Sequence, residues 1–364
     1  MKLQVTQENL NRALSSVARI ASSRGTLPIL ANVLIKTSKN RLSLSATNLE
    51  VAITHFIGAK VGDGGAITVP ARLMQDFIGS LPEGVINLEL EGTKLHITTD
   101  QYQSVVNGII ADDFPVMPTM NNGSSWKMSS GVLKKALQQV VFTASSDETR
   151  PALTGVLIRT SEGELVMAAT DSYRLAEKRL GKENQNIELL IPATSLNDLL
   201  RIIGDSDEEV KVTHNEQQVL FQVGDIELVT RLLEGSYPDY QKLIPKDFTT
   251  TVRLKRADLI SITKISGLFA RESAGSITID VDTEKKKLSI RSVASQLGEN
   301  TATAQASKVT GGGSITLNSR FLLDALSAMT GDEIVFGFNG KLEPTLLQDP
   351  NDLDYRHVVM PLKS

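Results

Sequence analysis

The 364-residue sequence contains no cysteine. This absence excludes a disulfide framework, a thiolate metal site and a cysteine nucleophile, and it fits a reducing cytosol. Aromatic residues make up only 4% of the chain, but its 41% hydrophobic and 22% charged residues are typical of a soluble globular protein. No apolar run approaches the roughly 18 residues that a membrane-spanning helix requires, and the opening MKLQVTQENLNRAL predicts a strand and a helix rather than an export signal. We therefore expect a cytoplasmic protein without a membrane partner.

The sequence also lacks a recognisable catalytic constellation. Its four histidines are scattered without metal-ligand spacing. The glycines of residues 61–67 (VGDGGAI) and 310–315 (TGGGSI) lack the lysine and following helix of a phosphate loop, so we interpret both stretches as hairpin turns. The acidic stretches DSDEEV and QDPNDLDY do not have the spacing of a calcium loop. These patterns predict no enzyme, no cofactor and no metal site.

The sequence contains a long internal repeat. Residues 42–53 (LSLSATNLEVAI) resemble residues 165–176 (LVMAATDSYRLA), and overlaying Thr47 on Thr170 requires a shift of 123 residues. The same shift superimposes Leu14 on Leu137, Pro28 on Pro151 and Pro115 on Pro238. A weaker third copy follows at a further shift of 126 residues. Because domains usually span about 100 to 150 residues, we expect three domains, at residues 1–120, 121–247 and 248–364.

Each repeat combines helical and strand periodicity. The first helix of each copy has an apolar stripe, formed by Leu10, Leu14, Val17 and Ala21, by Leu133, Leu137, Val140 and Ala144, and by Leu259, Ile262, Ile265 and Phe269. A second, shorter helix is predicted within residues 70–82, 192–204 and 318–331. Alternating stretches such as VKVTH and SITIDVD predict antiparallel strands between the helices. The expected fold class is α+β, with two helices and about eight antiparallel strands in each of three tandem domains.

Positive charge is concentrated in the predicted helices, although the formal net charge of the chain is -4. Six helical segments contain twelve lysines and arginines but only five acidic residues. These segments are residues 8–24, 71–80, 130–146, 193–204, 255–271 and 319–330. In the first segment, Arg12, Ser16 and Arg19 lie opposite the apolar stripe, where a solvent-facing or phosphate-facing row belongs. The alternative is an ordinary solvated helix face.

The three copies, with TLPILANVLI, RPALTGVLI, ATDSYRLA, EGSYPDYQKLIP and a terminal VVMPLKS in this order, resemble the bacterial sliding clamps, the beta subunits of DNA polymerase III. The resemblance covers essentially the whole chain. It implies a ring-forming head-to-tail homodimer, with helices around duplex DNA and sheets on the outside. It also implies a protein without chemistry or cofactor, which holds DNA without sequence preference and tethers the replicative polymerase to it.

The resemblance further implies an apolar peptide-binding cleft between the second and third domains. Extended peptides of the polymerase, the clamp loader and repair proteins would insert aliphatic and aromatic anchors there. The residues assigned to this cleft are Arg150, Leu153, Thr170, Tyr173, Arg174, Leu175, Pro238, Lys242, Leu243, Val358, Met360, Pro361 and Leu362. Ser172 and Tyr173 replace the Gly-His of some members, Lys242 replaces a common arginine, and the chain ends in Leu-Lys-Ser rather than Met-Arg-Leu. These departures bear on peptide preference.

Two further sets of residues follow from the resemblance and from the charge pattern. Arg24 occupies a position that contacts DNA in the family, and the basic helices add four DNA-facing candidates, which are Arg12, Arg19, Lys134 and Lys135. Leu268 and Phe269 would lie at the subunit interface of the homodimer.

Two alternatives to a ring stay open. The first is a monomeric or open DNA-binding scaffold made from the same repeats, which solution mass would distinguish. The second is a hydrolase that depends on Ser206, in the tripeptide Gly-Asp-Ser at residues 204–206. Because this tripeptide follows a helical run and precedes acidic residues, a helix C-cap and turn is the better interpretation.

Overall fold

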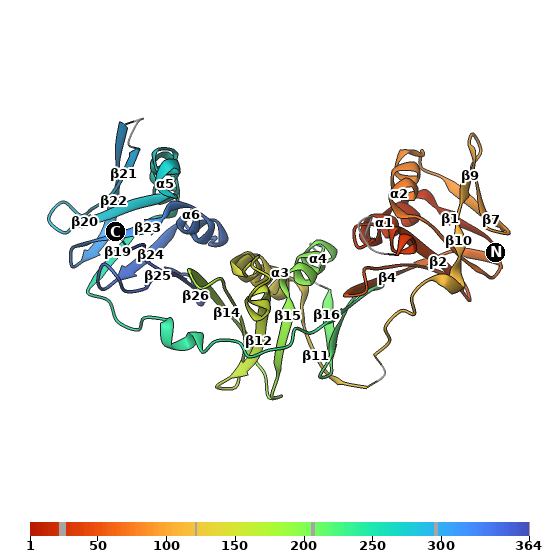
Figure 1. Ribbon diagram of the computed structural model, residues 1–364, viewed down its shortest axis with the longest axis horizontal. Helices are drawn as coiled ribbons and strands as arrows, with labels where there is room; N and C mark the ends of the chain where they lie inside the picture. Colours follow the sequence, from red (N-terminus) through yellow and green to blue (C-terminus); the bar gives the residue numbers. More distant parts are fainter. Residues whose placement is uncertain (22–26, 121, 205–207, 295–297, 364) are drawn as a thin grey trace. The chain divides into compact units, whose positions relative to one another are not determined.

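The computed structural model describes residues 1–21, 27–120, 122–204, 208–294 and 298–363 (Figure 1). Within these ranges, every helix is too short or too polar to cross a membrane. The chain forms two compact units, one of residues 1–134 and 194–232, the other of residues 135–193 and 233–364.

Unit 1 contains the first repeat and part of the second. Its elements are β1 (Lys2–Thr6), α1 (Gln7–Val17), β2 (Asn32–Ser38), β3 (Arg41–Thr47), β4 (Val51–Gly58), β5 (Lys60–Asp63), β6 (Ala66–Pro70), α2 (Ala71–Ser80), β7 (Val85–Glu91), β8 (Lys94–Thr98), β9 (Gln103–Asn107), β10 (Ile109–Ile110), β11 (Ser124–Ser129), most of α4 (Ala193–Ile202), β16 (Glu209–His214), β17 (Gln218–Val223) and β18 (Ile226–Arg231). They form a five-stranded sheet, β5-β1-β7-β8-β9, and a nine-stranded sheet, β10-β6-β2-β3-β4-β18-β17-β16-β11. Helix α1 packs on α2 and on strands β3 and β4.

Unit 2 contains the rest of the second repeat and all of the third. Its elements are most of α3 (Ser130–Val140), β12 (Gly155–Ser161), β13 (Glu164–Thr170), β14 (Arg174–Lys182), β15 (Glu188–Pro192), β19 (Thr250–Lys255), α5 (Arg256–Phe269), β20 (Ser276–Asp282), β21 (Lys287–Ala294), β22 (Gly298–Thr310), β23 (Gly313–Asn318), α6 (Ser319–Ala328), β24 (Glu333–Phe338), β25 (Thr345–Asp349) and β26 (Asp352–Val359). Short 3-10 helices occur at Val141–Thr143, Pro151–Thr154 and Tyr240–Leu243. One twelve-stranded sheet runs β15-β12-β13-β14-β26-β25-β24-β19-β22-β21-β20-β23.

Consecutive repeats are joined by strand pairing. Strand β4 of the first repeat pairs antiparallel with β18 of the second, and β14 of the second pairs in the same way with β26 of the third (Figure 1 shows β14 beside β26). The order β6-β2-β3-β4-β18-β17-β16-β11 therefore recurs as β15-β12-β13-β14-β26-β25-β24-β19. We call these pairings the first and the second junction. Because both join different repeats, the compact units cut across the repeats, and the domain limits at residues 120 and 247 stay a prediction.

The predicted α+β class with helices on antiparallel sheets is confirmed, and so is most of the apolar stripe. Leu10, Leu14 and Val17 of α1 are fully buried, as are Leu133 and Val140 of α3, with Leu137 at 1% exposure. These residues recur at intervals of three and four along their helices, so each helix presents one face to its sheet.

The predicted buried face of helix α5 is wrong at Ile265, which is 46% exposed. Thr263 and Ser266 are buried in its place. Their polarity is satisfied, because the Thr263 hydroxyl donates to the carbonyl oxygen of Leu259 (2.6 Å) and the Asn300 amide donates to the Ser266 hydroxyl (2.9 Å). Burying a hydroxyl that keeps a hydrogen-bond partner costs little free energy. The buried face of α5 therefore includes polar residues, which a search for hydrophobic residues alone does not find.

The two predicted hairpin turns are also wrong. Strand β5 pairs with β1 whereas β6 pairs with β2, so residues 64 and 65 link two different sheets. Strand β22 pairs with β21 and β19, and β23 pairs with β20. Both glycine stretches instead allow close chain approach. A Cβ atom on Gly65 would lie 2.7 Å from that of Met1, and Gly311, at a φ of +73°, lies against the Thr249 carbonyl.

Candidate functional site

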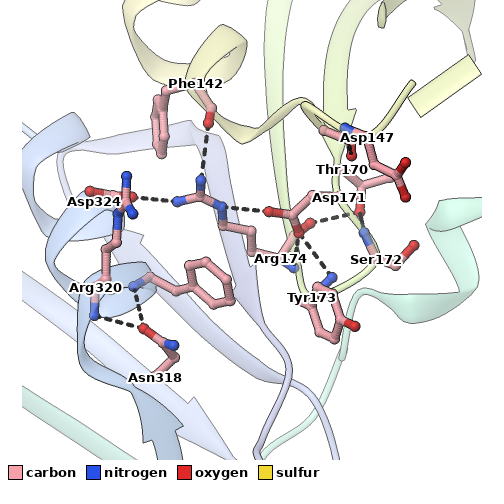
Figure 2. Close-up of polar contacts among 12 residues, drawn as sticks. Phe142, Asp147, Thr170, Asp171, Ser172, Tyr173, Arg174, Asn318, Arg320 and Asp324 are labelled. Carbon is pink, nitrogen blue, oxygen red and sulfur yellow. Dashed lines mark hydrogen bonds and ion pairs between the residues drawn. The ribbon is translucent and has the colours of Figure 1, made fainter. Parts of the chain in front are cut away.

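The turn between strands β13 and β14 is held by two of its own side chains (Figure 2). The Thr170 hydroxyl accepts a hydrogen bond from the Ser172 amide (3.1 Å) and donates one to the carbonyl oxygen of Arg174 (2.6 Å). Oδ1 of Asp171 accepts from the amides of Tyr173 (2.9 Å) and Arg174 (3.0 Å). Ser172 has a φ of +76°, a left-handed conformation that costs roughly 1–2 kcal/mol for a residue with a side chain. These hydrogen bonds therefore stabilise an otherwise unfavourable backbone.

The first repeat has the same turn between strands β3 and β4. The Thr47 hydroxyl accepts from the amide of Leu49 (3.0 Å) and donates to the carbonyl oxygen of Val51 (2.9 Å). Asn48 Oδ1 accepts from the Val51 amide (2.8 Å), and Leu49 has a φ of +77°. The sequence similarity at a shift of 123 residues therefore reflects one hydrogen-bonding scheme used twice.

A hydrophobic core lies beside the second turn. Leu175 and Val358, paired across β14 and β26, are 2% and 1% exposed and belong to this core. Partly buried side chains pack against it from three parts of unit 2, and these are Ala152, Leu233, Tyr237, Ile244, Phe248 and Met360. Burial raises the pKa of the Tyr237 hydroxyl far above its usual value, so this tyrosine is uncharged and adds apolar surface.

The structure brings the predicted cleft residues into this one region but gives them different exposures. Leu153, Thr170, Leu175 and Val358 are buried, whereas Arg174, Met360, Pro361 and Leu362 are half-buried, and Arg150, Tyr173, Pro238, Lys242 and Leu243 are exposed. Two cations at the edge already have partners. Arg150 donates to the Ser172 hydroxyl (3.1 Å), and Lys242 forms an ion pair with Asp239 (2.7 Å).

The C-terminal tail is attached to this region through its backbone. The Met360 amide donates to the carbonyl oxygen of Tyr173 (2.8 Å), and the Leu362 amide donates to that of Thr316 in β23 (2.9 Å). Its half-buried Met360 packs against the hydrophobic core. We call the surface formed by the Tyr173 turn, residues 238–248 and residues 360–362 the turn-and-tail surface. Its exposed groups suit an extended ligand with apolar anchors.

Arg174 lies beside this surface and is almost fully engaged (Figure 2). Its side chain is 10% exposed. Nε donates to Asp171 Oδ2 (3.0 Å), Nη1 to Asp324 Oδ2 of helix α6 (2.6 Å) and Nη2 to the carbonyl oxygen of Phe142 (3.1 Å). The rings of Phe142 and Phe321 lie 5.4 and 4.7 Å from the guanidinium carbon, within cation–π range.

The first junction has a pocket with charged walls at the corresponding place. A cavity of about 950 Å³ there is lined by three arginines and three acidic residues, which are Arg12, Arg19, Arg201, Asp198, Glu208 and Asp225, and also by His55. Arg12 and Arg19, both predicted to face DNA, are exposed. Arg201 forms an ion pair with Asp198 (2.8 Å). Because Arg201 is paired, the exposed Arg12 and Arg19 are the candidates for contact with anionic groups such as phosphates.

His55, which also lines this pocket, is largely buried. It is 5% exposed, and its Nδ1 atom lies 3.2 Å from the Ser16 hydroxyl. Burial, followed by the positive charge of Arg12, lowers the pKa of His55 to about 4. His55 is therefore neutral at physiological pH and adds no positive charge to the pocket.

Of the other predicted DNA-facing residues, the two lysines of α3 already have partners within the protein. Lys134 donates to the carbonyl oxygen of Gly204 (3.4 Å), and the ammonium group of Lys135 lies 2.7 Å from Asp352 Oδ2. This ion pair competes with any phosphate contact by Lys135. Arg24 lies outside the described residues, as does Ser206 of the hydrolase alternative.

The predicted interface residues occupy the last turn of helix α5. Leu268 is 55% exposed, and Phe269 is half-buried. Together with Ile265, Leu268 forms an exposed apolar strip on a helix that otherwise packs on β21 and β22. In the part of the chain that the structure describes, no cluster of histidine and acidic side chains could hold a metal ion.

The sequence interpretation missed Phe321 and Asp324 of helix α6, which surround Arg174. A signal for Asp324 was present. Asp76, Asp198 and Asp324 occupy the same place in the second helix of the three repeats, at shifts of 122 and 126 residues. Ion pairs between elements far apart in sequence require the fold, so the signal indicated the position but not the partner.

Comparison with known proteins agrees with this architecture. Three family models of the DNA polymerase III beta subunit match the chain in order. They are the N-terminal domain at residues 1–118, the central domain at residues 127–239 and the C-terminal domain at residues 241–363. A beta sliding clamp of Synechocystis is 33% identical over 389 aligned residues, which cover 100% of this chain and 99% of the relative.

Solved structures show the same similarity. The crystal structure of a DNA polymerase sliding clamp from Bacillus subtilis has a TM-score of 0.95 at 28% identity, over 100% of this chain and 99% of that chain. A sliding clamp from Pseudomonas aeruginosa, bound to griselimycin, has a TM-score of 0.95 at 25% identity over the full length of both chains. Because all three of its domains match and the similarity extends over its whole length, the chain belongs to the bacterial sliding clamps, the beta subunits of DNA polymerase III.

Proposed function

We propose that the chain forms a head-to-tail homodimeric ring that encircles duplex DNA in the cytoplasm and tethers the replicative polymerase to it. Sliding clamps are processivity factors and not enzymes, so the proposed action is a topological hold on DNA. The polymerase, the clamp loader and repair proteins bind the turn-and-tail surface through short peptides. The domain limits at residues 120 and 247 belong to the same proposal.

The strand pairing between repeats carries the proposal. Strands β9, β18 and β26 are equivalent in the three repeats, and β18 and β26 each pair with the preceding repeat, through β4 and β14. Strand β9 has a described partner on one side only, β8. Residues 298–305 of β22, the equivalent of β4 and β14, likewise pair on one side only, with β21. Pairing β9 with β22 of a second copy would repeat the two internal junctions and close a ring, because such a heterologous contact closes when its rotation permits.

Exposed apolar side chains support the same pairing. Leu268 is the repeat equivalent of Phe142, and Leu73 of helix α2 is the equivalent of Phe321. At the second junction both phenylalanines lie against Arg174, whereas Leu268 and Leu73 are 55% and 53% exposed. A partner whose Leu73 meets Leu268 would bury both.

The ring proposal is tested by solution mass. Leu268→Asp and Leu73→Asp should each convert the dimer to monomer in light scattering, because each places a charge in the proposed contact. Leu342→Asp is the matched control, since Leu342 is similarly exposed, at 66%, and lies outside that contact. A monomeric unaltered chain would favour the open scaffold instead.

Topological retention tests the encircling of DNA. Once loaded on nicked circular DNA, the ring should persist at salt concentrations that abolish ordinary phosphate binding, and it should leave when the circle is cut. If salt removed the protein equally from circular and linear DNA, the ring mechanism would be wrong.

A further inference from the structure

We propose that Arg174 is a positioning residue of the turn-and-tail surface. By bridging Asp171 and Asp324, it attaches the turn that carries Tyr173 to helix α6, and peptide affinity depends on this bridge. The inference rests on the proposed function of this surface. It gives Arg174 a different role from that of the predicted cleft residues whose side chains are exposed.

The guanidinium of Arg174 is held by contacts within the protein. Each of its three nitrogens donates to a protein oxygen, and two aromatic rings lie within cation–π range of it (Figure 2). Arginine and carboxylate groups form strong, geometrically defined hydrogen bonds. The bridge therefore uses three of the five N–H groups of Arg174.

The bridge fixes the groups that a peptide would meet. Arg174 holds Asp171 Oδ2, and the other oxygen of Asp171 holds the amide of Tyr173. The exposed ring of Tyr173 stacks on Phe321 of helix α6, with ring centroids 6.4 Å apart, and its carbonyl oxygen accepts the Met360 amide. Asp324 is three residues beyond Phe321 on the same helix. One carboxylate on α6 therefore helps to set the positions of both the aromatic turn and the first residue of the tail.

The first junction shows that the turn can form without such a bridge. Its turn keeps the same hydrogen bonds and the same left-handed residue, but Val51 stands in the place of Arg174. Asp198, the equivalent of Asp324, pairs instead with Arg201 of its own helix. The Arg174 bridge is therefore unnecessary for the turn conformation, and what it adds is the attachment of that turn to α6.

The test removes the Asp324 carboxylate and leaves Arg174 in place, because a truncated arginine could disturb folding. Asp324 is 34% exposed at its side chain, which makes Asp324→Ala tolerable, and Asp324→Asn is the milder variant. Asp198→Ala is the matched control at the first junction. Fluorescence anisotropy with a labelled peptide rich in Gln and Leu measures affinity, light scattering measures dimer mass, and hydrogen–deuterium exchange measures protection of residues 171–175.

We expect Asp324→Ala to weaken the peptide roughly tenfold, since a hydrogen bond to a charged group is lost, and to accelerate exchange at residues 171–175. Asp324→Asn should have a smaller effect, and Asp198→Ala none. Unchanged affinity in Asp324→Ala would refute the inference and leave the proposed function intact. Weaker binding without faster exchange would also refute it, because Asp324 would then contact the peptide directly. If the unaltered chain did not bind the peptide, the proposed peptide surface would fail and the inference with it.

Discussion

Replacing Asp352 with asparagine should destabilise unit 2 strongly, because this carboxylate neutralises a buried lysine. Asp352, at the start of β26, accepts from Lys178 of β14 (2.6 Å) and from Gln139 of α3 (3.2 Å), and Lys135 lies 2.7 Å away. Asp352 is 8% and Lys178 6% exposed. Asp352→Asn would leave the Lys178 ammonium buried without an anion, and breaking a buried pair in this way costs about 3–5 kcal/mol.

Thermal unfolding measures this cost. In a body of 150–250 residues, each kcal/mol lowers the melting temperature by about 2–4 °C, so Asp352→Asn should lower the transition of unit 2 by roughly 10 °C in calorimetry. Asp225→Asn provides the control, because it removes the exposed partner of Arg41, and an exposed ion pair contributes at most about 1 kcal/mol. Equal shifts in the two variants would refute the claim that burial makes the Asp352 cluster important.

The same cluster predicts a dependence of stability on pH. Burial opposes ionisation of Asp352, but hydrogen bonds from Lys135, Lys178 and Gln139 outweigh it and lower its pKa to about 2. A carboxylate whose pKa is lower in the folded state stabilises the protein above its unfolded pKa of about 3.9 and loses this contribution as the pH falls toward 2. The contribution is at most about 2.6 kcal/mol, and Asp352→Asn should remove this part of the acid sensitivity in urea unfolding at pH 5 and pH 3.

Three further predictions concern the proposed surfaces and the first junction. Deleting residues 360–364 should lower peptide affinity at least about a hundredfold, because buried apolar anchors of roughly 1.5–3 kcal/mol each lose their contact, and an unchanged anisotropy titration would contradict this. Arg12→Ala, Arg19→Ala and Arg24→Ala should each weaken DNA binding and reduce its salt slope by about 1, without a change of dimer mass; a slope equal to that of the unaltered chain would argue against a phosphate contact. His55 has a pKa of about 4 in the folded chain, so it should stabilise unit 1 above about pH 6.5 and lose that contribution as the pH falls toward 4. Amide exchange of helix α1 should therefore be faster at pH 4.5 than the intrinsic exchange rate explains.

Local patterns predicted the elements well where a repeat reinforced them. The apolar residues of α1 and α3 agreed at one shift and proved buried, and the similarity of two polar turns identified two equivalent strand connections. The third repeat was harder, because helix α5 buries Thr263 and Ser266, whose hydroxyls have partners that only the fold supplies. The glycine stretches were misjudged for the same reason. Whether two successive strands pair or enter different sheets depends on contacts remote in sequence.

The candidate site was predicted as a set of residues but not as an arrangement. Sequence could not distinguish Leu175, which belongs to the core, from Leu243, which is 45% exposed, since both are aliphatic residues near a turn. It also could not find the role of Arg174, because its partner Asp324 lies 150 residues further along the chain. Lys135 was predicted to face DNA, yet it neighbours a carboxylate of the third repeat.

The two internal junctions show how one duplicated scaffold acquires two kinds of surface. Both have the same turn and the same strand order, so the backbone does not distinguish them. The side chains do, because Arg19 and Val51 of the first junction correspond to Phe142 and Arg174 of the second. At the second junction the arginine lies between two aromatic rings and is bound to Asp324, and the cavity that Phe142, Arg174 and Asp324 line measures about 390 Å³. At the first junction valine stands in place of the arginine, and the cavity measures about 950 Å³ and is lined by three arginines and three acidic residues. Different side chains on one backbone arrangement thus give the two junctions cavities of different size and charge.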